Sequence, residues 1–145
     1  MISIVLVIED DPVVQELIKS ELESSGIKVV QVYSLSEVRE QLLLIKDRVY
    51  TAVLWDGAIP EKADEPNNLV LATPLLRIAL AMKSQTCMIT ISSNEEIQIQ
   101  HMKMGCDARF EKYLTSPDAS EDALPTGLIV NDALAKDVLA YLQKL

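Results

Sequence analysis

The feature that most constrains the fold is an alternation of short apolar runs with helical patterns along nearly the whole chain. Five runs of strand length hold mostly aliphatic and β-branched residues, the composition of strands buried on both faces. Apolar residues at helical spacing follow each run, and parallel strands need such crossovers. The order predicts an α/β fold, a doubly wound, five-stranded parallel sheet with helices on both faces. The expected strands cover residues 2–8, 28–33, 50–55, 87–92 and 108–112.

Turn-forming and capping residues predict where the helices begin and end. Asp11 and Pro12 form an N-cap and first-turn pair before the first helix, and Gly26 stands where that helix would end. The apolar positions expected to face the core in this helix are Val14, Leu17, Ile18 and Leu22. The later helices are expected to begin at Ser36, at Thr73 with Pro74, and at Ser93 with Glu96 in capping-box spacing, and the last covers residues 131–145.

Two segments without an apolar period are expected to be loops. Residues 57–72 contain the sequence PEKADEPNN, and residues 113–129 contain two prolines. A chain of 145 residues has the usual length of one domain, so we expect a single domain over residues 1–145.

Composition and charge argue against several classes of protein. With 22 acidic and 13 basic residues the formal net charge is −9, which disfavours non-specific binding to nucleic acid or to an anionic membrane surface. The apolar run over residues 2–8 is too short for a signal peptide or a membrane span. Cys87 and Cys106 lie in apolar or helical patterns without disulfide-framework spacing, so we expect free thiols in a reducing compartment. We therefore expect a soluble cytoplasmic protein.

Polar side chains stand at the carboxyl ends of the expected strands. In a parallel sheet these ends share one edge, so residues distant in sequence converge there. Clustered carboxylates predict a hard divalent cation with oxygen ligands, and Mg²⁺ is the usual choice where phosphate is handled. A nearby lysine and hydroxyl supply the positive charge and the hydrogen bond that a phosphoryl group needs. The residues are Glu9, Asp10 and Asp11 after the first strand, Asp56 after the third, Ser92 after the fourth and Lys112 after the fifth.

Four short motifs stand in this sequence in the order that one known family has them. They are ED after VLVI, the Asp of LWDGAIP with a proline four residues on, the hydroxyl that ends MITIS, and the Lys of RFEKY. In these motifs the chain resembles the receiver domain of two-component response regulators. The resemblance implies a flavodoxin-like, receiver-type fold and a phosphoacceptor signalling switch that catalyses only its own phosphorylation and dephosphorylation. It also implies a histidine kinase or histidine phosphotransfer protein as phosphoryl donor, and a downstream protein as target.

The resemblance implies a role for each matching residue. Asp56 matches the aspartate that accepts the phosphoryl group. Asp10 matches a direct Mg²⁺ ligand and Glu9 a second acidic group that often acts through water. The backbone carbonyl of Ala58 would complete the protein's share of the coordination. Lys112 matches the lysine that pairs first with the acceptor and then with the phosphate.

Two departures from the family concern signal relay. Ser92 matches the switch hydroxyl that moves toward a new phosphoryl group, but its spacing to Gly105 is shorter than typical, which leaves Thr90 as an alternative. Arg109 occupies the position of the usual aromatic residue, which departs from the common relay from hydroxyl to aromatic ring. The output surface is expected on the fourth helix, the fifth strand and the fifth helix.

Further departures motivate other hypotheses. Tyr113 stands where the family usually has a proline after the lysine, so a cis Lys-Pro turn cannot form, and the loop after Pro60 is longer than typical. Together with Arg109 these features motivate a second hypothesis, a receiver-like interaction module that does not signal by phosphorylation. A third hypothesis, a Mg²⁺-dependent phosphohydrolase, is weaker because no second Asp lies two residues after Asp56 to act as acid and base.

Two further side chains are assigned no chemistry. Trp55 is expected to pack beside Asp56, where it can serve as a fluorescence reporter. His101 lies in the middle of a helical pattern among polar residues, so we expect it at the surface.

Overall fold

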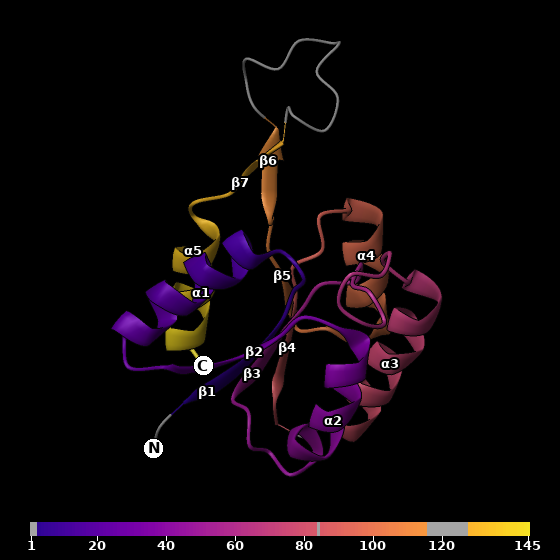
Figure 1. The fold of residues 1–145 in the computed structure, drawn as a ribbon. Coiled ribbons are helices and arrows are strands. Elements are labelled where there is room, and N and C mark those ends of the chain that lie inside the picture. Colours follow the sequence, from indigo (N-terminus) through magenta and orange to yellow (C-terminus); the bar gives the residue numbers. More distant parts are fainter. Residues whose placement is uncertain (1–2, 84, 116–127) are drawn as a thin grey trace.

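A five-stranded parallel sheet forms the centre of the computed structural model, which describes residues 3–83, 85–115 and 128–145 (Figure 1). The strand order is β2-β1-β3-β4-β5, so β1 has a neighbour on either side and β5 lies at an edge. The predicted doubly wound parallel sheet is confirmed. The strands are β1 (Ile4–Ile8), β2 (Lys28–Val32), β3 (Ala52–Trp55), β4 (Cys87–Thr90) and β5 (Ala108–Arg109).

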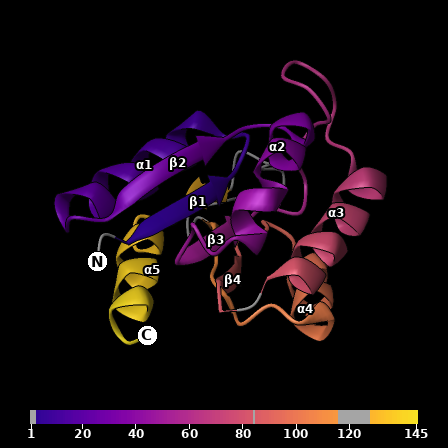
Figure 2. The same ribbon diagram turned by 90° about the horizontal axis from the view of Figure 1, so that it is seen from below.

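Helices cover both faces of the sheet, as the sequence predicts (Figure 2). Successive strand residues point to opposite faces, so Val7 packs with α1 and α5 while Leu6 packs with α2 and α3. In the described residues, no helix is both long and apolar enough to cross a bilayer. The helices are α1 (Pro12–Ser24), α2 (Leu35–Lys46), α3 (Leu69–Met82), α4 (Glu95–Met104) and α5 (Leu134–Gln143).

Two helix starts differ slightly from the sequence prediction. The predicted cap of α1 is confirmed, because the Asp11 carboxylate accepts a hydrogen bond from a first-turn N–H. However, Ser34 rather than Ser36 caps α2, and Asn94 rather than Ser93 caps α4. Each cap is the residue whose backbone is still extended and whose side-chain oxygen reaches the N–H three residues on. Several Ser and Asn residues precede each helix, so the sequence pattern alone does not separate them.

The segment predicted as a loop over residues 57–72 ends early, because α3 begins at Leu69. The N–H of Ala72 already donates to the carbonyl of Asn68 at 3.0 Å, which is helical spacing. The Thr73–Pro74 pair therefore lies inside α3 and does not start it. Proline removes one interior hydrogen bond, a local cost that the buried apolar face of α3 offsets.

The segment predicted as a loop over residues 113–129 contains two strands. β6 (Tyr113–Thr115) and β7 (Leu128–Val130) pair antiparallel in a second, two-stranded sheet, while residues 116–127 lie outside the described part. Three residues per strand are too few for a period to show in the sequence. This hairpin stands above the carboxyl edge of the main sheet (Figure 1).

The edge strand predicted over residues 108–112 is shorter in the structure. β5 ends at Arg109, and its two residues pair only with β4. An edge strand has one neighbour to hold it, so pairing ends as soon as the chain diverges from β4. Lys112 therefore lies in the short connection between β5 and β6.

A buried glutamine joins α1 to the two strands beneath it. The sequence predicts Leu17 in the core, but Leu17 is 38% exposed and Gln15 is fully buried in its place. The Gln15 amide nitrogen lies 3.1 Å from the carbonyl of Val7 and 3.0 Å from those of Glu9 and Val32. Its donors therefore satisfy backbone groups where β1 and β2 end, next to the acidic residues.

The first prediction concerns this glutamine. Gln15→Met keeps the shape of the side chain but removes its donors, so it should lower the free energy of unfolding by about 1–3 kcal/mol. Gln100→Met on the exposed face of α4 is the matched control and should change it by less than about 0.5 kcal/mol. Urea unfolding measures both, and equal small effects would contradict the role given to Gln15.

Candidate functional site

Carboxylates from two neighbouring strands meet at the carboxyl edge of the sheet. Ile8 and Trp55 are register partners in β1 and β3, and the next residues along are Glu9 and Asp56. Asp10 follows directly. One carboxylate oxygen from each of these three acids lies within 4.8 Å of the others. The convergence expected from the sequence is therefore present in the structure.

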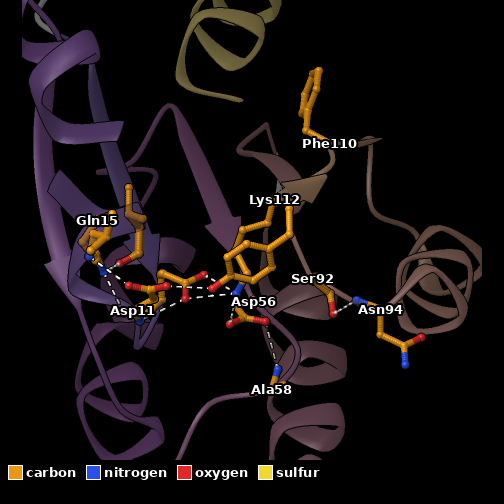
Figure 3. A network of polar contacts seen from close by, with 12 residues as sticks. Asp11, Gln15, Asp56, Ala58, Ser92, Asn94, Phe110 and Lys112 are labelled. Atoms are coloured by element: carbon orange, nitrogen blue, oxygen red, sulfur yellow. Dashed lines mark hydrogen bonds and ion pairs between the residues drawn. The ribbon is translucent and has the colours of Figure 1, made fainter. Parts of the chain in front are cut away.

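A buried lysine lies between two of these acids (Figure 3). The Nζ atom of Lys112 is 2.9 Å and 3.1 Å from the two carboxylate oxygens of Glu9, and 2.9 Å from Oδ2 of Asp56. The side chains are 4%, 0% and 1% exposed, respectively. Charges removed from water in this way need partners, because an unpaired buried charge is strongly destabilising.

Burial and the charges within the site shift the pKa values of all three groups. Burial, followed by the charge of Asp56, raises the pKa of Glu9 to about 9. Burial also raises the pKa of Asp56, although Lys112 acts in the opposite direction. Burial alone would lower the pKa of Lys112, but the charges of Asp56 and Glu9 outweigh it and raise that pKa above its ordinary value. The site therefore favours additional positive charge.

The donor set fits a hard divalent cation. Asp10 is half-buried, and in the described residues its carboxylate makes no hydrogen bond or ion pair, so its oxygens are open to a ligand. The N–H of Ala58 donates to Oδ1 of Asp56 at 3.1 Å, which brings the Ala58 backbone close to the carboxylate of Asp56. Three carboxylates of this kind are typical ligands of Mg²⁺ or Ca²⁺.

Two hydroxyls at the end of β4 have different partners. The Ser92 hydroxyl is fully buried and accepts a hydrogen bond from the N–H of Asn94 at 3.3 Å (Figure 3). The Thr90 hydroxyl lies 2.7 Å from Nδ1 of His101. Thr90 is therefore bonded to a side chain within α4, whereas Ser92 is bonded to the backbone of the residue that caps α4.

The prediction that His101 lies at the surface is wrong. Its side chain is 1% exposed, and burial lowers its pKa to about 4, so the ring is neutral at neutral pH. A methyl group on Gly57 would lie 2.7 Å from Cε1 of His101 and 2.7 Å from Cγ2 of Ile97. The residue next to Asp56 thus packs directly on α4. The polar residues Gln98 and His101 occupy the buried face of α4, so an apolar period could not reveal it.

Sequence reasoning also missed contacts around Tyr113. The Tyr113 hydroxyl donates to Oδ2 of Asp11 at 2.7 Å, and its ring centroid lies 5.1 Å from Nζ of Lys112. No cis peptide bond occurs in the described residues, as expected where tyrosine follows the lysine. In the sequence, the signal for these contacts is that Tyr113 directly follows Lys112. The hydrogen bond of Tyr113 to Asp11 depends on the β6–β7 hairpin, where the sequence predicts a loop.

No protein-family model matches the sequence, and no curated protein matches it. A CheY-like response regulator receiver domain from Methanospirillum hungatei JF-1 matches with a TM-score of 0.65 at 20% identity, covering 99% of this chain and 96% of its own. The chain has the receiver fold.

Other solved structures agree with this fold. The receiver domain of a putative LuxO repressor protein from Vibrio parahaemolyticus has a TM-score of 0.65 at 16% identity, with 99% of this chain and 92% of its own covered. The response regulator domain of Thermotoga maritima CheB has a TM-score of 0.64 at 18% identity, with 99% and 96% covered. At sequence identities between 16% and 20%, the similarity to these structures shows a shared fold alone. In this receiver fold the acids, the hydroxyl and the lysine lie at the carboxyl edge of the sheet.

The second prediction concerns His101, the single histidine of the chain. Between pH 6.5 and about 4 the unfolded chain takes up a proton that the folded chain does not, so the free energy of unfolding should fall as pH falls through this window. The shift corresponds to about 3 kcal/mol at most. Urea unfolding at several pH values should show a smaller decrease for His101→Gln than for the wild type. The same slope in both proteins, or an NMR titration of the histidine near pH 6.5, would contradict the buried position.

Proposed function

We propose that the chain is a phosphoacceptor signalling switch in which Asp56 takes up a phosphoryl group with the help of Mg²⁺. The observation that carries the proposal is the convergence of Glu9, Asp10 and Asp56 within 4.8 Å, with the Lys112 ammonium 2.9 Å from Asp56. A histidine kinase or a histidine phosphotransfer protein is the proposed donor, and a downstream protein is the proposed target. The two buried free cysteines, Cys87 and Cys106, are consistent with a reducing cytoplasm.

The proposed chemistry is a transfer to a carboxylate. An oxygen of Asp56 attacks the phosphorus of a phosphohistidine, the P–N bond breaks, and the histidine leaves with its electron pair and takes up a proton. The product is an acyl phosphate at Asp56. Attack of water on the phosphorus later restores the carboxylate and releases inorganic phosphate, so the only group that the chain modifies is its own Asp56.

The residues around Asp56 have distinct proposed roles. Glu9, Asp10, Asp56 and the carbonyl of Ala58 hold the cation, which when bound offsets the negative charge of the carboxylates and of the incoming phosphoryl oxygens. Lys112 leaves Glu9 to pair with one oxygen of the phosphoryl group.

A second part of the proposal concerns output. The Ser92 hydroxyl bonds another phosphoryl oxygen, and the β4–α4 connection follows it. The amide of Gln98 donates to the carbonyls of Ser92 and Phe110, so α4 and the end of β5 are linked to this connection. A changed position of Ser92 would therefore be transmitted to the surface of α4, β5 and α5, the proposed contact for the target.

Solved structures with this fold support the proposal. A response regulator from Burkholderia pseudomallei, with a TM-score of 0.57 at 18% identity, contains a phosphorylated aspartic acid and a calcium ion. The receiver domain of Klebsiella pneumoniae RstA, with a TM-score of 0.61 at 21% identity, is described as activated by BeF3. These properties are those of the two proteins named. We extend them to this chain because Glu9, Asp10 and Asp56 lie close together in it.

The third prediction tests the cation site. Mg²⁺ should raise the free energy of unfolding, by about 2.7 kcal/mol at a concentration 100 times its Kd. Asp10→Asn removes a carboxylate that makes no hydrogen bond in the described residues, so it should leave the metal-free stability within about 0.5 kcal/mol and weaken Mg²⁺ binding about tenfold or more.

Asp47→Asn, at the exposed end of α2, is the matched control and should leave Mg²⁺ binding unchanged. Thermal unfolding across a Mg²⁺ titration measures these effects. A wild type whose stability does not respond to Mg²⁺ would contradict the cation site.

The fourth prediction tests the phosphoryl site through Trp55, which is fully buried directly before Asp56. With Mg²⁺ present, beryllofluoride should change the Trp55 fluorescence of the wild type and of Asp47→Asn. Asp56→Asn removes the carboxylate oxygen that would bind beryllium, so it should abolish the response. A response that survives in Asp56→Asn would contradict the assignment.

The same measurements distinguish the alternatives. A folded wild type that responds to neither Mg²⁺ nor beryllofluoride would favour the receiver-like interaction module. That hypothesis is motivated by Arg109, by Tyr113 in place of the usual proline, and by the long loop after Pro60. Sustained multiple turnover on a phosphomonoester would favour the phosphohydrolase.

A further inference from the structure

The connection between β5 and β6 carries Lys112 but belongs to neither sheet. Its backbone is held from the other side of the hairpin by Asn131. The N–H of Asn131 donates to the carbonyl of Lys112 at 2.9 Å, and the Asn131 amide donates to the carbonyl of Glu111 at 2.9 Å. These contacts fix the main chain. They do not determine where the ammonium lies, because it stands at the end of a flexible four-carbon side chain.

Tyr113 contacts the ammonium itself. Its ring centroid lies 5.1 Å from Nζ of Lys112, within the range of a cation–π interaction. Its hydroxyl donates to Oδ2 of Asp11 at 2.7 Å, while Oδ1 of Asp11 accepts from the N–H of Val13 at 2.9 Å. Asp11 is therefore fixed as the cap of α1. Tyr113 is held at its backbone by the pairing of β6 and at its hydroxyl by Asp11, and these two contacts fix its ring.

We propose that Tyr113 is a positioning residue that holds the Lys112 ammonium between Glu9 and Asp56, through its ring and through the anchor of its hydroxyl on Asp11. This inference rests on the proposed function and deepens it, because a phosphoryl group on Asp56 needs the ammonium in a defined place. The ammonium bonds both carboxylates, and the flexible side chain of Lys112 would let it move while it keeps contact with either one. A ring fixed next to the ammonium would limit that movement.

The anchor is consistent with the electrostatics around the phenol. Burial and the bond to Asp11 raise the pKa of Tyr113 above its ordinary value, so the hydroxyl keeps its proton and remains a donor. Loss of that donor would leave an Asp11 oxygen without its partner and would free the ring to move away from Lys112. Removal of the ring would also admit water to the ammonium.

The fifth prediction uses the exchange of the Lys112 ammonium protons with water, measured by ¹⁵N NMR on the metal-free, unphosphorylated protein. The wild type should give a resolved, slowly exchanging signal that is absent in Lys112→Arg. Tyr113→Phe, which keeps the ring, should speed the exchange about fivefold. Tyr113→Leu should speed it about tenfold or more. Tyr141→Leu removes a half-buried ring elsewhere, and as the matched control it should leave the exchange unchanged.

An unchanged exchange rate in Tyr113→Phe overturns the inference, whether or not Tyr113→Leu folds. Equally fast exchange of the Lys112 ammonium protons in Tyr141→Leu also overturns the inference, because it would then reflect a general loosening of the structure. Beryllofluoride titration of the same proteins separates this inference from the proposed function. Tyrosine-dependent exchange without any beryllofluoride response contradicts the proposed function alone. A beryllofluoride response with exchange unaffected by Tyr113 contradicts the positioning role alone.

Discussion

A buried ammonium held between two buried carboxylates is the interaction on which the rest of the site depends. Glu9 and Asp56 end neighbouring strands, so the sheet itself brings their charges together. Lys112 bonds both, yet burial and mutual repulsion still raise the pKa of Glu9 to about 9. The open carboxylate of Asp10 adds more negative charge. A divalent cation would balance the negative charge of these carboxylates. The cation and the Lys112 ammonium would then both be placed to bind a phosphoryl group.

Buried polar side chains, more than apolar packing, connect this interaction to the rest of the molecule. Gln15 bonds the backbone where β1 and β2 end, directly beside the acids. On the opposite side, His101 bonds Thr90 and packs on Gly57, so α4 contacts the residue after Asp56. Each of these contacts has a favoured geometry, so a change at one of them would affect the position of α4.

The sheet, its helices and the acidic edge were predictable because they depend on local patterns. Apolar runs define strands, and parallel strands place Glu9 and Asp56 at the same edge of the sheet. That the two residues are neighbours there depends on the strand order, in which β1 pairs with β3. His101 and Gln15 were not predictable in this way, since they lie on buried helix faces where the hydrophobic period expects apolar residues. In the sequence, Tyr113 stands out only because it replaces the proline that the family usually has after the lysine. Its contact with Asp11 joins residues far apart in sequence through strands of three residues, which carry no recognisable period.

In the proposed function, Asp56 is the residue that receives a phosphoryl group. Incubation with Mg²⁺ and a small-molecule acyl phosphate, reduction with borohydride and peptide mass mapping test it most directly, because borohydride converts an aspartyl phosphate to homoserine. We expect homoserine at position 56 alone, and only when Mg²⁺ is present. An unmodified Asp56, or a modification at Asp10 or Asp11 in its place, would contradict it.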